Sequence, residues 1–208
     1  MKRIMIFVFG LMMTAAIVAA QNWKMSWNFD KDQVGEIAKG FNGLGGRWEV
    51  VTDDTAPSKP QVLAQLAKSA GAAFNLTLAS GTNYEDVDIT VKMKAIAGST
   101  DQGGGIVWRA KDAKNYYVAR YNPLEDNYRL YHVANGQRSE LKSASIAHTL
   151  GWQTLRVTMM GDHIECYYDG KKYLDAKDST LKKPGKIGLW TKADAQTRFD
   201  DLAVSGRP

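Results

Sequence analysis

Apolar and polar residues alternate along most of the chain in short runs, which Gly, Asn, Asp and Pro separate. This two-residue period is typical of β-strands that bury one face, and many short runs of this kind indicate a sandwich or barrel. One weak 3.6-residue period, over 61–72, is rich in Ala and lacks a clear helix cap, so we interpret it as a strand running into a turn. We therefore predict an all-β chain with strands over 25–30, 47–52, 61–67, 74–78, 87–95, 105–109, 116–122, 128–133, 141–145, 153–160, 163–168, 171–176, 186–191 and 197–205.

Tight turns connect several of these runs. Asn135-Gly136 and Asp169-Gly170 are dipeptides that type I′ turns prefer, because both central residues of such a turn need a positive φ. Residues 128–145 and 153–176 are therefore predicted to form antiparallel meanders. The sequence shows no internal repeat and no long linker, which favours one domain over 21–208.

The first 20 residues have the features of a cleavable signal peptide. Lys2 and Arg3 give a positive start, residues 4–11 are apolar, and Val18-Ala19-Ala20 matches the small-x-small pattern of signal-peptidase sites. We expect cleavage after Ala20 and export to the periplasm or the cell exterior, because the apolar stretch is short for a membrane anchor. No later segment of the sequence is apolar enough to span a membrane.

Charge and cysteine usage argue against two classes of function. The formal net charge is +5, and loss of Lys2 and Arg3 with the signal peptide lowers it to +3. Acidic residues are spread among the basic ones, so the sequence does not predict a nucleic-acid-binding surface. Cys166 is the single cysteine and lies in a predicted strand, where we interpret it as a buried thiol and not as a nucleophile.

Three segments carry a family resemblance: 115–131, the Gly-Trp-Gln-Thr-Leu-Arg-Val run at 151–157, and 186–202 with its Lys-Ile-Gly-Leu-Trp-Thr-Lys start. In their order and spacing they resemble secreted bacterial proteins of the LamG-like, concanavalin-A-like lectin/glucanase superfamily, nearest to the 3-keto-disaccharide-hydrolase-like domains. The resemblance implies a concanavalin-A-like jelly-roll β-sandwich of two antiparallel sheets, whose concave outer face often binds glycans. It implies no single activity, because members include lectins, hydrolases and proteins with no known role.

Strand parity predicts which side chains share a sheet face. Alternate residues of a strand point to the same side, so polar and aromatic residues of four strands gather on one surface if their faces align. With Asp194 just after the last of these strands, the predicted ligand-binding residues are Arg109, Arg120, Asn122, Arg129, Tyr131, Trp190, Lys192 and Asp194.

Such a set suits a carbohydrate ligand. Trp190 and Tyr131 offer ring faces to the C–H side of a sugar, and the arginines donate hydrogen bonds to hydroxyls. Several arginines would also favour an anionic or oxidised sugar, since a guanidinium group pairs with a carboxylate. Neighbouring arginines repel unless they are paired, and Glu125 and Asp126 in the following loop are the expected partners. The alternative is an ordinary solvated sheet face, and it stays open at this stage.

Catalytic residues are harder to assign. Asp86 and Asp88 share a face as retaining glucanases require, but Thr90 occupies the third position. An enzyme acting on 3-keto sugars would need a base and an electrophile, for which Asp194 with Lys192 or His132 are the candidates. The catalytic residues are therefore left unassigned.

A structural calcium ion is a further expectation. Asp200 and Asp201 in the last strand are predicted to lie near Asp30 after the first strand, and related sandwiches often hold calcium at such a seam. The alternative is an acidic pair that faces solvent.

Three hypotheses about function remain. The leading one is a non-catalytic, exported carbohydrate-binding protein that uses the concave sheet face. The second is a glycoside hydrolase or lyase acting on 3-keto sugars, as the named relatives imply. The third is a protein-interaction module, and the sequence does not indicate an oligomeric state.

Overall fold

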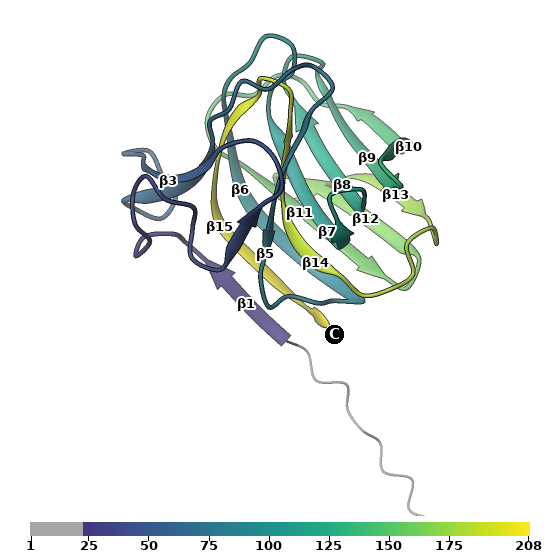
Figure 1. Cartoon of the computed structure of the whole chain (residues 1–208). Coiled ribbons are helices and arrows are strands. Elements are labelled where there is room, and N and C mark those ends of the chain that lie inside the picture. Colours follow the sequence, from purple (N-terminus) through teal and green to yellow (C-terminus); the bar gives the residue numbers. More distant parts are fainter. Residues whose placement is uncertain (1–22) are drawn as a thin grey trace, which may run out of the picture.

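Two antiparallel β-sheets pack face to face in the computed structural model, which describes residues 23–208 (Figure 1). The predicted signal peptide, 1–20, lies outside the described residues. The eight-stranded sheet has the order β13 (Lys171–Lys177), β12 (His163–Tyr168), β11 (Gln153–Met160), β6 (Asp86–Ala97), β15 (Gln196–Arg207), β4 (Gln61–Gln65) and β3 (Trp48–Thr52), and β1 (Trp23–Trp27) also pairs with β15. The seven-stranded sheet has the order β10 (Gln137–Ser145), β9 (Asn127–Ala134), β8 (Asn115–Asn122), β7 (Gly104–Asp112), β14 (Lys186–Lys192), β5 (Phe74–Ala79) and β2 (Phe41–Gly43).

The predicted all-β sandwich is confirmed. Each predicted strand is present with shifted ends at most, including β4 at the start of the weakly helical stretch. The short strand β2 was missed, because three residues are too few to show an alternating pattern. Within 23–208 no helix is long and apolar enough to cross a membrane.

The predicted hairpin turns have the backbone that their residues favour. The φ angles are 53° at Asn135 and 81° at Gly136, and 45° at Asp169 and 80° at Gly170. Positive φ at both central residues is the type I′ requirement, so these turns fix the register of β9 with β10 and of β12 with β13. Both predicted meanders are confirmed.

The main core lies between the sheets and is formed by the inward-facing residues of both. Trp108 and Tyr117 stack there with ring centroids 5.5 Å apart, and the thiol of Cys166 is fully buried in the same cluster. Burial raises the pKa of Cys166 well above its usual range, which keeps the thiol protonated and unreactive. The interpretation of Cys166 as a buried strand thiol is confirmed.

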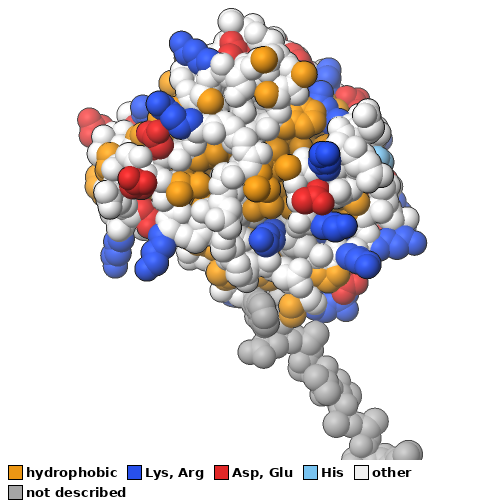
Figure 2. Space-filling model, viewed as in Figure 1, with side chains coloured by type: hydrophobic (Ala, Val, Ile, Leu, Met, Phe, Trp, Pro, Cys, Tyr) orange, Lys and Arg blue, Asp and Glu red, His pale blue; other side chains and the backbone are white. Residues whose placement is uncertain are grey.

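A second hydrophobic cluster covers the outer face of the seven-stranded sheet, so this face is not an ordinary solvated one. Its members are buried although they point away from the main core: Leu76, Leu78, Val107, Ala110, Tyr116, Val118, Tyr131, Val133 and Trp190. Figure 2 shows apolar side chains in the middle of this side of the molecule, with charged side chains around them. Nearly every residue of β7, β8 and β14 is buried, because these strands are covered on both faces.

Candidate functional site

Two arginines face each other on this outer face. Arg120 on β8 and Arg129 on β9 are directly opposite in register, and both contact Glu125 in the turn between the strands. Glu125 Oε2 lies 2.8 Å from Arg120 Nη2 and 3.5 Å from Arg129 Nη1, and Asn127 Oδ1 accepts a 2.8 Å hydrogen bond from Arg120 Nη1. Glu125 is thus the shared partner that the arginines were expected to need, whereas Asp126 supplies the positive φ of the turn, 49°.

The arginines also determine the ionisation of Glu125. Burial by itself would raise the pKa of this carboxyl, but hydrogen bonds from Arg120 and Asn127 outweigh it and lower the pKa to about 2. A carboxylate held in this way is a weak proton acceptor at neutral pH. Glu125 is therefore suited to orienting the arginines and accepting hydrogen bonds from a ligand, and poorly suited to act as a general base.

Aromatic rings lie beside the arginines. Trp190 on β14 donates from Nε1 to Tyr116 Oη at 3.2 Å, and the ring centroid of Phe74 lies 5.4 Å from that of Trp190. Trp190 is opposite Gly105 on β7, and Gly105 is opposite Arg120 on β8. A side chain at Gly105 would overlap the backbone of β8, so this position admits only glycine.

The predicted stacking role of Trp190 and Tyr131 needs correction. Both lie on the predicted face, but Trp190 is only 1% exposed and Tyr131 only 3%. Neither ring therefore presents an open face to solvent, because the side chain of Arg138 lies over both rings and Phe74 packs against Trp190. Their role in this structure is to form an apolar bed for the polar groups above.

Arg138 on β10 is part of this site and was missed in the sequence. Its guanidinium carbon lies 4.4 Å from the ring centroid of Tyr131, 5.3 Å from that of Phe74 and 6.0 Å from that of Trp190. The predicted strand began only at Leu141, which left Arg138 in a turn. The Asn-Gly turn was the signal that could have found it, since a two-residue turn sets Arg138 opposite Val133.

A polar network lies at one end of the face. Asp101 is buried and joins two predicted site residues: Oδ1 accepts from Asn122 Nδ2 at 2.8 Å, and Oδ2 lies 3.0 Å from Lys192 Nζ. Asp194 is not part of this contact but holds the loop that carries Asp101. Its carboxylate accepts hydrogen bonds from the backbone N–H groups of Ser99 and Asp101 at 2.8 and 2.9 Å, and these bonds keep the pKa of Asp194 well below its usual range.

Arg109 does not lie with the other predicted residues. A bulge shifts the register of β7 against both neighbours, and Arg109 itself has a φ of 45°. Its side chain is buried and donates three hydrogen bonds to backbone carbonyls, those of Glu85, Leu181 and Gly161, at 2.7 to 3.0 Å. The expectation that Arg109 shares the face of Arg120 is wrong, because the bulge breaks the alternation on which it depended.

The catalytic candidates do not form a site either. Asp88 makes a bidentate pair with Arg156 at 2.8 Å for both bonds, on the outer face of the other sheet. His132 alternates with Tyr131 and faces away from it, with Nδ1 3.5 Å from Asp178 Oδ2. Of the proposed partners of Asp194, His132 thus lies on the inner face of the seven-stranded sheet and Lys192 pairs with Asp101. Asp194 itself accepts hydrogen bonds from backbone N–H groups that hold its pKa well below the usual range, so it is a weak base.

Two of the three predicted calcium ligands, Asp30 and Asp200, already accept hydrogen bonds within the chain. Asp200 accepts hydrogen bonds from the backbone N–H and the hydroxyl of Ser58, both at 2.9 Å, and Asp30 accepts one from the N–H of Gln61 at 3.2 Å. Throughout residues 23–208, the carboxylate oxygens of Asp30, Asp200 and Asp201 do not gather within 4.8 Å as a group. These residues do not fit a calcium site composed of all three.

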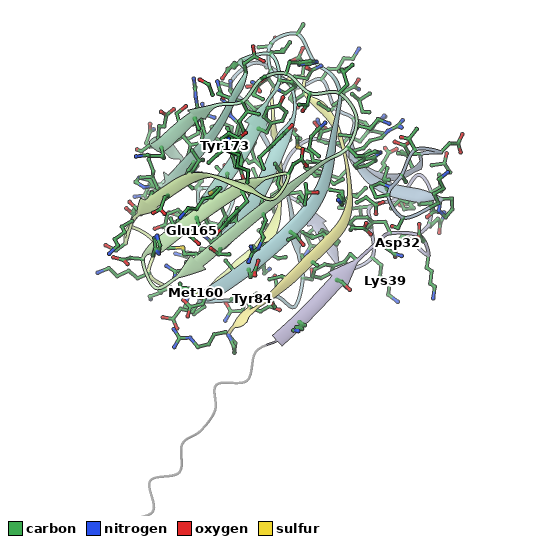
Figure 3. All side chains as sticks on the ribbon, turned by 180° about the vertical axis from the view of Figure 1, so that it is seen from behind. Asp32, Lys39, Tyr84, Met160, Glu165 and Tyr173 are labelled. Carbon is green, nitrogen blue, oxygen red and sulfur yellow. The ribbon has the colours of Figure 1, made fainter. Side chains whose placement is uncertain are left out.

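A different trio does converge, on the outer face of the eight-stranded sheet, where Figure 3 labels Glu165. His163, Glu165 and Asp175 bring ligand-type atoms within 4.8 Å of one another. The ammonium group of Lys172 lies 2.7 Å from Glu165 Oε1 and 2.7 Å from Asp175 Oδ2. A cation of the protein itself therefore already lies in this exposed cluster and offsets one of its two carboxylate charges.

Comparison with known proteins places the chain among glycan-related proteins. The model of a family described as the 3-keto-alpha-glucoside-1,2-lyase-like domain matches residues 21–205. A levanase from Bacillus subtilis (strain 168) is 28% identical over 153 residues, which are 72% of this chain and 20% of the levanase. The chain thus spans about a fifth of the length of that relative.

Solved structures show the same fold. The carbohydrate binding module CBM66 from Bacillus subtilis has a TM-score of 0.66 at 22% identity, over 78% of this chain and 93% of the module. The GH43 protein BlXynB from Bacillus licheniformis has a TM-score of 0.59 at 15% identity, over 86% of this chain and 38% of that protein. At these identities the likeness concerns the fold, and it confirms the concanavalin-A-like jelly-roll sandwich.

Proposed function

The chain belongs to the family of 3-keto-α-glucoside-1,2-lyase-like domains, and on this basis we propose that it is a carbohydrate-binding protein whose ligand lies on the outer face of the seven-stranded sheet. The observation that carries the proposal is a set of convergent polar groups above buried rings. Arg129, Glu125 and Glu140 are between a third and a half exposed at this face, with side-chain exposures of 33%, 39% and 44%. Sites for small polar ligands commonly combine an apolar bed with a few oriented donors and acceptors.

Donors without a partner support this choice of face. The side chain of Arg120 is only 3% exposed, and its buried Nε has no hydrogen-bond partner within the described chain. A buried N–H group without an acceptor costs free energy, which a ligand hydroxyl or ring oxygen would recover. The match to a carbohydrate binding module in fold and to a levanase in sequence adds support for a sugar as the ligand.

A catalytic role on 3-keto sugars is the second candidate, and the family match is the observation that favours it. A ketone makes the proton on the neighbouring carbon acidic. A base that removes this proton, with a donor that stabilises the oxyanion, would allow elimination: a C=C bond forms, the glycosidic C–O bond on the next carbon breaks, and the departing alcohol takes back the proton from the base. The Nε of Arg120, which is buried and unpaired within the described chain, is the candidate donor for such an oxyanion. Glu125, the carboxylate beside it, is a weak base for the reason given above, so binding without turnover is the better-supported function.

The test is a binding screen of the protein against a glycan panel by isothermal titration calorimetry, with 3-keto disaccharides included and the sugars analysed afterwards. Arg129→Gln removes an exposed donor from the face, and Arg156→Gln removes an arginine of 41% side-chain exposure from the opposite sheet as a matched control. Binding that Arg129→Gln weakens by about tenfold and Arg156→Gln leaves unchanged is the expected result. Consumed sugar would establish the enzymatic alternative, and binding that only Arg156→Gln weakens would move the site to the other sheet.

We expect the protein to be exported, as its first 20 residues indicate. Cell fractionation with mass spectrometry of the mature N-terminus tests this: a chain that starts at Gln21 outside the cytoplasm supports export. Retention of residues 1–20 in the cytoplasmic fraction contradicts it.

A further inference from the structure

Arg138 is the arginine of this face that has no carboxylate partner. Across residues 23–208, ion pairs within 4.0 Å join Arg120 and Arg129 to Glu125, and Arg129 to Glu140, whereas none involves Arg138. Its Nη1 is buried and makes no hydrogen bond within this part of the chain. Arg138 therefore carries a positive charge and at least one N–H group that the described chain does not satisfy.

The rings beneath Arg138 hold its guanidinium group in place. The guanidinium carbon lies within 4.4 to 6.0 Å of the ring centroids of Tyr131, Phe74 and Trp190. Stacking on aromatic faces leaves the N–H groups at the edge of the guanidinium plane available for an in-plane acceptor. Packing against apolar rings also lowers the local dielectric constant, which strengthens any charge pairing at this point.

The charges of the face also favour an anionic partner for Arg138. Three guanidinium groups, those of Arg120, Arg129 and Arg138, share two carboxylates, Glu125 and Glu140, which leaves one positive charge. Lys192 does not alter this balance because Asp101 pairs with it. The three guanidinium groups therefore exceed their carboxylate partners by one positive charge.

From these observations we infer that Arg138 recognises the carboxylate of an acidic sugar. The inference rests on the proposed carbohydrate-binding function and names its ligand class. Two parallel N–H···O bonds between a guanidinium edge and a carboxylate fit both planar groups, and Arg is the side chain best suited to that geometry. Arg120 lies beside this position, with its guanidinium carbon 5.9 Å from the same Tyr131 ring, and its buried Nε has no partner within the described chain.

The test compares acidic glycans with neutral forms of the same chains. Polygalacturonate, alginate and glucuronan oligosaccharides are titrated into the protein by calorimetry beside their carboxyl-reduced counterparts, in which each uronic acid has become a neutral sugar. At least one acidic glycan is expected to bind about tenfold or more tightly than its reduced form, because a charged hydrogen-bonded pair is lost on reduction. Arg138→Gln is expected to abolish this preference.

Arg156→Gln is the matched control, because Arg156 also lies over a tyrosine ring, that of Tyr167 at 5.0 Å, but on the other sheet and paired with Asp88. It should keep the preference for the acidic form. Thermal melting of each variant checks that it is folded. Arg138→Lys keeps the positive charge but not the bidentate geometry, so it should bind the acidic glycan more tightly than Arg138→Gln and less tightly than the wild type.

Three outcomes would overturn the inference in distinguishable ways. Equal affinity for acidic and reduced glycans, with binding still sensitive to Arg129→Gln, would rule out carboxylate recognition and retain the proposed carbohydrate site. An acidic preference that survives Arg138→Gln assigns the recognition to another residue. Binding of no glycan, acidic or neutral, removes the proposed function together with the inference.

Discussion

The indole Nε1 of Trp190 donates a 3.2 Å hydrogen bond to the phenol oxygen of Tyr116, although both side chains lie on the outer face of the sandwich. Tyr116 is fully buried, and burial raises its pKa to about 12. An outer sheet face normally exposes its aromatic residues, so this pair marks the face as a packed layer of its own. The polar groups that we assign to ligand binding are held on that layer.

Replacement of Trp190 by Ala is expected to destabilise the protein by about 3 to 5 kcal/mol, as for a fully buried aromatic residue. The reason is the lost packing against Phe74 and the lost hydrogen bond to Tyr116. Urea unfolding followed by far-UV circular dichroism measures the difference. Trp152→Ala is the control, because this partly exposed indole should cost clearly less. A loss below about 1 kcal/mol for Trp190→Ala would contradict the burial of the ring.

Arg109→Ala is expected to reduce stability by about 3 kcal/mol and to leave glycan affinity unchanged. The guanidinium group of Arg109 satisfies three loop carbonyls and lies away from the face to which we assign the ligand. Urea unfolding and calorimetric titration together check both parts. Arg207→Ala removes a half-exposed arginine that pairs with Glu85 and Asp86 and should cost below about 1 kcal/mol. A weaker glycan affinity in folded Arg109→Ala would contradict this prediction and indicate that Arg109 contributes to binding.

Asp200 is expected to make the protein less stable as the pH rises from about 4 to 6. Burial raises the pKa of its carboxyl to about 6, against 3.8 for an exposed aspartate, despite hydrogen bonds from Ser58. In this pH window the unfolded chain releases a proton that the folded chain retains, so ionisation favours unfolding by up to about 3 kcal/mol at neutral pH. Asp200→Asn should remove this dependence.

The measurement is urea unfolding of both proteins between pH 3.5 and 7.5. The stability of Asp200→Asn relative to the wild type should rise with pH through the window and become constant above it. Parallel curves across the whole range would show that Asp200 ionises normally in the folded protein.

Asp194→Ala is expected to loosen the loop at 98–101 without unfolding the sandwich. The backbone N–H groups of Ser99, Thr100 and Asp101 all donate to the Asp194 carboxylate, at 2.8 to 3.1 Å. Hydrogen exchange of these three amides should accelerate by about tenfold or more in the variant, while amides of the central strands remain protected. Unchanged exchange in the loop would mean that Asp194 does not hold it.

A looser loop should also disturb the proposed ligand face, because the loop carries Asp101, which pairs with Lys192 and Asn122. Glycan affinity in Asp194→Ala is therefore expected to fall along with the protection of the Asp101 amide. A variant with fast loop exchange and unchanged affinity would place the ligand away from this end of the face.

Regular strands made much of the site predictable. Along β8, β9 and β14 the two-residue period holds, so parity correctly brought Arg120, Arg129, Tyr131, Trp190 and Lys192 to one face. The same period on β7 failed at Arg109, because a bulge inserts a residue and inverts the alternation. A bulge depends on hydrogen bonding to both neighbouring strands, and a single sequence does not show it.

The sequence by itself determined the all-β class, most of the strands, the turns that set their register and the placing of Arg120, Arg129 and Lys192 on one face. These features depend on neighbouring residues, whose periodicity and backbone preferences act locally. The tertiary structure alone decided that Trp190 is buried and that Arg138 lies over Phe74, Tyr131 and Trp190. Those contacts join β5, β9, β10 and β14, which are distant in sequence, and only the packing of side chains across the sheet determines which rings are covered and which charge is left without a partner.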